Sequence, residues 1–291
     1  MPSTRDIRRR IKSVKNTAQI TKAMQMVAAS KMRKAQMAAL AGRPYASLMN
    51  EVLSALVSSS KDFSHPLLEK RDIRNRCVIV VSTDKGLCGG LNSSLMREAA
   101  KLPMDTAFIT AGRKASQFIA RTKRKLIAEF TYKDAPAFAE ARAISKFARD
   151  IYIKGEVDQI DILFTNFVST LVQKPEIRQL LPISEIKHVR AGIGQDAGHP
   201  APQSSPGEFL FEPDQDQVLG ALLPHSLNFE VYQILLECKA SEHSARMVAM
   251  KNATDNAQQF IKDLTLEYNK LRQANITKEL LEISSAAMAL G

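Results

Sequence analysis

Apolar side chains recur at steps of three and four along residues 3–60, which is the period of a helix packed along a partner helix. The series comprises Ile7, Ile11, Val14, Ala18, Ala28, Met32, Ala35 and Ala39. Gly42 and Pro44 predict a kink or a break in this helix, because proline removes a backbone hydrogen bond. We therefore expect an N-terminal coiled-coil helix over residues 1–60.

A second apolar series, Ile20, Met24 and Val27, lies on a different face of the same helix. A two-helix coiled coil needs only one apolar stripe, so the second stripe predicts that further protein surrounds the helix. A helix buried in an ordinary bundle would show the same pattern, and periodicity alone leaves both interpretations open.

The middle of the chain, residues 75–190, changes to short β-branched runs that alternate with helical stretches. The runs that predict strands are 77–82, 106–110, 125–131, 161–168 and, as a possible fifth, 179–183. Helices are expected near 92–102, 112–122 and 136–154. This alternation predicts a Rossmann-like α/β domain with helices on the faces of its sheet.

The last third of the chain begins with a polar stretch and then returns to a helical pattern. Residues 191–208 are rich in Gly, Pro, Ser and Gln, which predicts a solvated linker over 191–213. A C-terminal coiled-coil helix is expected over 214–291, in which Pro224 closes a short first segment and 226–288 lack Pro and Gly. Its apolar stripe comprises Met250, Ala253, Ala257, Ile261, Leu264, Tyr268 and Leu271.

The lengths of the two terminal helices predict how they are arranged. At about 1.5 Å per residue each extends roughly 90 Å, whereas a compact domain of this chain length is about 40 Å across. Helices of similar length at opposite ends of the chain are therefore expected to pair and to protrude. The predicted fold class is α/β plus coiled coil: a long antiparallel two-helix coiled coil from the N- and C-terminal helices with an inserted Rossmann-like α/β domain.

Charge is concentrated at one end of the chain. The formal net charge is +11, and residues 1–40 hold ten basic side chains and one acidic side chain. This predicts a polyanionic partner, which could be nucleic acid, an anionic membrane surface or an acidic protein. An Arg-rich start is also typical of a transit peptide, but the helical pattern begins at once and we interpret it as structure. No apolar run is long enough to span a bilayer.

The segment Ser82–Asn92, STDKGLCGGLN, is a Gly-rich loop between a predicted strand and a predicted helix. Such loops can bind phosphate on helix N–H groups, but neither common phosphate-binding consensus is present. A tight turn or a protein-contact loop is the favoured interpretation. The three cysteines show no disulfide or zinc spacing, which fits a reducing compartment, and the histidines are scattered. We expect no catalytic residue, no metal site and no cofactor.

Four motifs carry a resemblance to a known family. They are Ile20–Met32 (ITKAMQMVAASKM), the loop Ser82–Asn92, Ser244–Ala257 (SARMVAMKNATDNA) and Tyr268–Ile283 (YNKLRQANITKELLEI). In this order and spacing the chain resembles the gamma subunit of F-type ATP synthases. Two alternatives from other classes are a basic coiled-coil protein that binds nucleic acid and a nucleotide-binding enzyme that uses the Gly-rich loop.

The resemblance implies a central-stalk rotor shaft that has no active site of its own. In that family the paired helices stand inside a ring of three alpha and three beta subunits, and the α/β domain meets the epsilon subunit and the membrane c-ring. Ion flow, such as hydrogen ion transport, turns the c-ring and the shaft, and ATP is made or hydrolysed on beta. The chain would be present once per complex, as a peripheral membrane protein on the cytoplasmic face of a bacterial inner membrane.

The resemblance also implies contact residues, matched position by position. Met24 lies in the segment that meets an acidic lever loop of beta, with the cations Lys22, Arg33 and Lys34 nearby. Cys88 and its loop match a region near the lower rim of the ring. The apolar tail Ile283–Leu290 matches the tip held in a hydrophobic collar. The remaining partner-contact positions are Arg246, Arg272, Gln273 and Thr277, which face the ring, and Phe211 and Glu212, which face the c-ring.

Overall fold

The computed structural model describes residues 3–42, 44–46, 48–49, 51–53, 65–69, 71–183 and 214–290. The chain divides into two compact units. The first, here called the helical unit, consists of Met1–Ala28 and Met247–Gly291. The second, here called the sheet unit, is Ala29–Arg246.

Two long helices contribute residues to both units. They are α1 (Thr4–Ala41) and α6 (Gln215–Leu290). The expected linker at 191–213, which includes Phe211 and Glu212, lies outside the described residues.

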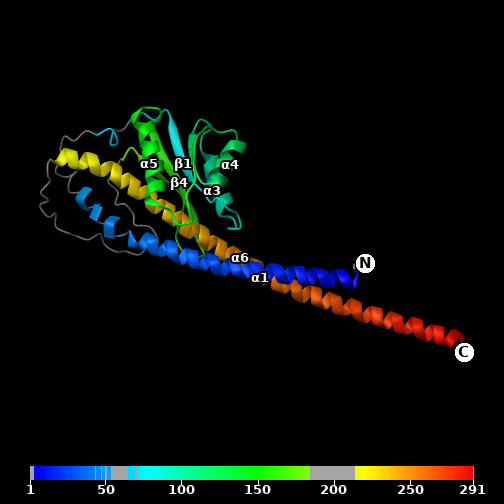
Figure 1. Cartoon of the computed structure of the whole chain (residues 1–291). Helices are drawn as coiled ribbons and strands as arrows, with labels where there is room; N and C mark the ends of the chain where they lie inside the picture. The colour runs from blue at the N-terminus through cyan, green and yellow to red at the C-terminus, as the bar shows by residue number, and fades with distance from the viewer. Residues whose placement is uncertain are drawn as a thin grey trace. The chain divides into compact units, whose positions relative to one another are not determined.

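In the helical unit, α1 and α6 lie side by side and run antiparallel (Figure 1). The guanidinium of Arg8 donates to the hydroxyl of Tyr268 at 2.5 Å, and the hydroxyls of Thr21 and Thr254 are 2.7 Å apart. The contacts follow α1 from Arg8 to Thr21 in one direction and α6 from Tyr268 to Thr254 in the opposite direction. This confirms the antiparallel pairing that the sequence predicts.

The seam between the two helices is formed by the predicted stripes. Ile7 is 1% exposed, and Ile11, Val14 and Ala18 are half-buried beyond it. On α6 the buried or half-buried positions from Met250 onward are Met250, Ala253, Thr254, Ala257, Ile261, Leu264, Tyr268 and Leu271. Every apolar residue predicted for the α6 stripe is in this set, and Thr254 is an addition that the apolar pattern did not contain.

The sheet unit contains five strands in the order β3-β2-β1-β4-β5. Strands β1 to β4 run parallel to one another, and the edge strand β5 pairs antiparallel with β4. The strands are β1 (Arg76–Val81), β2 (Ala107–Ala111), β3 (Leu126–Phe130), β4 (Gln159–Phe167) and β5 (Gln173–Leu181). The helices between them are α3 (Leu91–Lys101), α4 (Arg113–Arg121) and α5 (Phe138–Ile153). This arrangement confirms the predicted fold class.

Helices cover both faces of the sheet (Figure 1). Strand β1 alternates, with Cys77 and Ile79 in the core shared with α5 and α6, and Val78 and Val80 in the core shared with α3 and α4. Because both faces are buried, the strand is apolar throughout rather than alternating between apolar and polar. The segment of α6 before Arg246 is thus part of the core of the sheet unit.

Two sequence expectations were wrong at particular residues. The fifth strand is Gln173–Leu181 rather than 179–183, because it is an edge strand with polar side chains such as Lys174 facing outward. Pro224 does not end a helix but lies inside α6. An interior proline costs about 3 kcal/mol, and burial of Leu223 and Leu227 on either side offsets this, since each buried leucine contributes roughly 1.5–3 kcal/mol.

The end of α1 falls where the sequence predicts an interruption. The helix α1 ends at Ala41, the described residues 44–46, 48–49 and 51–53 are again helical, and 54–60 lie outside the described residues. Gly42 follows at a close approach to α6, because a Cβ placed on it would lie 1.8 Å from Nε2 of Gln233. A larger residue at this position would push that buried side chain aside.

Candidate functional site

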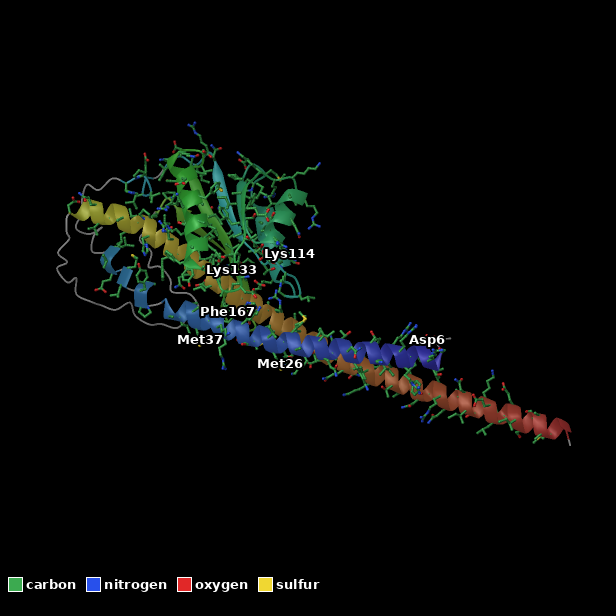
Figure 2. The ribbon with its side chains drawn as sticks, in the orientation of Figure 1. Asp6, Met26, Met37, Lys114, Lys133 and Phe167 are labelled. Atoms are coloured by element: carbon green, nitrogen blue, oxygen red, sulfur yellow. The ribbon has the colours of Figure 1, made fainter. Side chains whose placement is uncertain are left out.

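The helical unit exposes apolar side chains that its own seam does not use. On α1, Ile20 is 60% exposed and Val27 is 55% exposed, whereas Ile7 in the seam is 1% exposed. Met26, labelled in Figure 2, is 59% exposed. Ile20 and Val27 of the second apolar series therefore face away from α6, whereas Met24 is half-buried, and the exposed members are available to another protein surface.

The C-terminal part of α6 has the same property over a longer stretch. Phe260 and Leu266 are 52% and 57% exposed, although Leu264 between them is 5% exposed. From Arg272 to Met288 every residue is exposed. The large apolar side chains in this stretch are Ile276, Leu280, Leu281, Ile283 and Met288. A helix whose large apolar side chains are exposed needs a partner to bury them.

Basic side chains surround these apolar positions on α1. Arg9 and Lys22 are exposed, and the acidic residue in this stretch, Asp6, is held by its own neighbours. The hydrogen bonds from Ser3, with Arg9 nearby, hold the pKa of Asp6 below its usual value. The exposed surface is therefore both apolar and cationic, which suits a partner that is apolar and acidic.

The structure places the predicted contact residues in different settings. Lys22, Arg272 and Gln273 are exposed, Met24 is half-buried, and all four belong to the helical unit. Thr277 is exposed there too, and its hydroxyl donates to the carbonyl of Gln273 in its own helix. The exposed Arg33 and Lys34 belong to the sheet unit. Which of these residues meet a partner stays a prediction.

Cys88 is buried within the Gly-rich loop, and whether its loop meets a partner stays a prediction. Its side chain is 2% exposed, its sulfur accepts a hydrogen bond of 3.3 Å from Asn92 Nδ2, and burial raises the pKa of the thiol. The thiol therefore cannot itself form a contact surface, whereas the neighbouring Leu87 is 61% exposed. A pattern of residue types could not separate these two positions, because the turn that inverts them depends on the positive φ of Leu87 and Gly89.

The Gly-rich loop is filled by its own side chains. The carboxylate of Asp84 accepts a hydrogen bond of 2.9 Å from the backbone N–H of Arg113, at the start of α4. Asn92 donates to the hydroxyl of Thr83 at 2.8 Å. Asp84 thus caps α4, and Thr83 and Asn92 bond to each other, so these polar side chains of the loop are already engaged within the protein; this favours a tight turn or a protein-contact loop over the nucleotide-binding alternative.

Sequence reasoning missed a group of charged residues in the sheet unit. It consists of Lys31 of α1, Asp134 of the loop between β3 and α5, and Lys239, Glu242 and Arg246 of α6; we call it the ionic cluster. Arg246, which we expected to face the ring, pairs with Glu242 at 2.8 Å and donates to the carbonyl of Gly86 at 3.2 Å. The signal in the sequence was the spacing of three and four between opposite charges on α6.

Within the described residues, neither a metal site nor a membrane-spanning helix is present. In that part of the chain, no group of three or more His, Cys, Asp or Glu side chains is arranged to hold a metal ion. None of the helices within the described ranges is long and apolar enough to cross a bilayer. The candidate site in these ranges is therefore the exposed apolar surface of the two long helices, which is also cationic on α1.

Together these features define a class of protein: a non-globular helical pair with an unburied outer surface, joined to a parallel-sheet domain. A family model described as ATP synthase matches residues 3–290. Two relatives named ATP synthase gamma chain are 52% identical, from Opitutus terrae, and 48% identical, from Methylacidiphilum infernorum. The alignments cover 99% of both chains in the first case and 100% in the second. The chain belongs to the ATP synthase gamma chain family.

Solved structures share the fold. The rotor of the Euglena gracilis mitochondrial ATP synthase in rotational state 1 aligns with a TM-score of 0.66 at 20% identity, over 94% of this chain and 98% of that chain. A central stalk and c-ring structure from Tetrahymena thermophila mitochondrial ATP synthase aligns with a TM-score of 0.58 at 25% identity, over 80% and 99%.

Proposed function

We propose that this chain is the central-stalk rotor shaft of an F-type ATP synthase. In this role it couples ion-driven rotation of the c-ring to conformational change in the alpha and beta catalytic hexamer. The single observation that carries the proposal is the apolar outer surface of the helical unit, from Ile20 on α1 to Met288 on α6. Apolar side chains that the fold leaves bare gain about 1.5–3 kcal/mol each when a partner buries them fully.

The same surface suits a part that must turn. A rotor must bind its surroundings without settling in one deep minimum. The exposed cations on α1 can form ion pairs that are worth only about 0–1 kcal/mol each in water, so they can break and re-form as the helices turn. The buried seam, with Ile7 and Leu264, holds the two helices together while the outer contacts change.

The proposal assigns no catalytic step to this chain. ATP would be made or hydrolysed on the beta subunits, and this chain would need no metal or cofactor. Its partners would be the alpha and beta subunits, the epsilon subunit and the membrane c-ring. It would lie on the cytoplasmic face of a bacterial inner membrane as a peripheral subunit, one copy per complex, without inserting into the bilayer or binding nucleic acid.

Co-purification from the source organism tests the proposal. The tagged full chain is expected to bring down alpha and beta subunits in a three-to-three ratio with one copy of itself, together with epsilon. Removal of this chain should abolish ATP synthesis by membrane vesicles, and adding it back should restore synthesis. Recovery of the chain without alpha and beta subunits, or ATP synthesis that persists without it, would refute the proposal.

A further inference from the structure

The ionic cluster is buried at its centre. The Nζ atom of Lys239 lies 3.0 Å from Oε2 of Glu242 and 3.6 Å from Oδ1 of Asp134. The side chains of Lys239 and Glu242 are each 3% exposed, and the ammonium of Lys239 lies 4.5 Å from the centre of the Tyr132 ring. Charges this deeply buried are stable only while they remain paired, so the cluster fixes the relative positions of the elements that supply it.

Asp134 connects more elements than any other member of the cluster. One of its carboxylate oxygens pairs with Lys239 of α6, and the other accepts a hydrogen bond from Lys31 of α1. Buried His243 also faces it, with Nε2 3.9 Å away. A single carboxylate on a loop of the α/β domain is thus bound by an ammonium group from each of the two long helices.

Glu242 extends the cluster to a second loop of the α/β domain. It lies between Lys239 and Arg246, and Arg246 donates onward to the carbonyl of Gly86. The α/β domain therefore holds α6 through the loop that follows β3 and the loop that follows β1. The apolar contacts between α6 and the sheet are not directional, whereas charge-assisted hydrogen bonds are. The ionic cluster therefore supplies directional contacts against sliding or turning of the helices on the sheet, strongest at the buried Lys239–Glu242 pair, because the side chains of Lys31 and Asp134 are 46% and 51% exposed.

We propose that Asp134 is a positioning residue that carries torque from the α/β domain into the two long helices. This rests on the proposed function, in which torque enters at the α/β domain and leaves along α1 and α6. The paired ammonium groups of Lys31 and Lys239 act as two anchor points on one carboxylate, so a force on the domain moves both helices together.

The test compares two activities of the assembled complex, built with subunits from the same organism. ATP hydrolysis by the assembly of alpha, beta and this chain, detached from the membrane, sends no torque through the α/β domain. ATP-driven ion pumping by the complete complex in vesicles does. The variants are Asp134→Asn, Lys31→Gln and the double variant. Asp105→Asn is the matched control, because Asp105 is an exposed carboxylate of the same domain without an ion pair among the described residues.

Asp134→Asn is expected to leave detached hydrolysis unchanged and to lower pumping per ATP by roughly two- to thirtyfold, the range in which single residues alter coupling between sites. The loss should grow as the opposing ion gradient rises, and Asp105→Asn should pump normally. Lys31→Gln changes an exposed side chain, so it should not impair folding, and it should cause a smaller loss of pumping. The double variant should lose no more pumping than Asp134→Asn alone.

Two outcomes would overturn the inference. One is normal pumping by Asp134→Asn under a steep gradient, and the other is additive losses in the double variant. Either result leaves the proposed function intact if the wild-type chain assembles and pumps. Failure of the wild-type chain to assemble with alpha and beta subunits would instead refute the proposed function.

Discussion

Leu264 and Leu266 stand two positions apart on α6 and should respond in opposite ways to the same substitution. Leu264 is 5% exposed in the seam, and Leu266 is 57% exposed on the outer surface. Leu264→Ala removes buried volume and should lower the free energy of unfolding of the isolated chain by about 2–3 kcal/mol, the low end for buried leucines because the seam is one helix deep. Leu266→Ala should change it by less than about 0.5 kcal/mol.

The order should reverse for assembly. Full burial of a leucine contributes about 1.5–3 kcal/mol, and 57% of that remains to be gained at Leu266 when a partner covers it. After allowance for the methyl group that alanine keeps, the loss is roughly 1 kcal/mol, or about fivefold in affinity for the alpha and beta hexamer. Leu264→Ala should bind almost normally at temperatures where it is folded.

Urea unfolding followed by far-UV circular dichroism measures the first effect, and titration of the hexamer with labelled chain measures the second. The reasoning is refuted if Leu266→Ala unfolds as easily as Leu264→Ala, because the outer surface would then be part of the seam. It is also refuted if Leu266→Ala binds the hexamer with unchanged affinity.

Three further outcomes are expected. Arg272→Ala combined with Gln273→Ala, both exposed, should weaken torque coupling in vesicles without lowering the melting temperature of the chain, and normal coupled synthesis would count against this contact. Burial raises the pKa of Glu237 from 4.5 to about 7, so the carboxyl is protonated in the folded state and the stability of the chain falls as pH rises across that window. Glu237→Gln should therefore be about 1–3 kcal/mol more stable than the wild type at pH 8 and no different at pH 4, which urea titrations at both pH values would show. Gly112→Ala should destabilise by at least about 2 kcal/mol, since φ is +104° and a Cβ would meet the Ser82 carbonyl at 2.2 Å, whereas Gly155→Ala, with φ of +74° and open space, should lose only about 1 kcal/mol in thermal unfolding.

Periodicity predicted the elements whose packing is set by one repeated contact. The seam residues of α6 and the strand at 76–81 follow directly from apolar spacing, because each of these segments packs against apolar neighbours. The edge strand at 173–181 was misplaced because one of its sides is solvated, which makes Lys174 and Glu176 look like loop residues. Pro224 was misread because helix propensity is local, whereas its helix is held by the burial of the neighbouring Leu223 and Leu227 in the tertiary fold.

The exposed apolar surface could be predicted in part from the sequence, whereas the ionic cluster could not. The second apolar series on α1 could be predicted, since Ile20 and Val27 stand off the seam by simple counting. The ionic cluster could not, because Lys31, Asp134 and Lys239 lie far apart in sequence and only the fold brings them together. The burial of Cys88 beside the exposed Leu87 could not be predicted either, because the turn there depends on the positive φ of Leu87.

The unpartnered stretch from Arg272 to Met288 has a cost for the cell that makes this chain. A copy made in excess of its partner subunits exposes a row of leucine and isoleucine side chains, through which excess copies can aggregate and which proteases can reach. Synthesis of this chain must therefore be matched to the supply of the subunits that shelter it, and surplus copies should be cleared quickly.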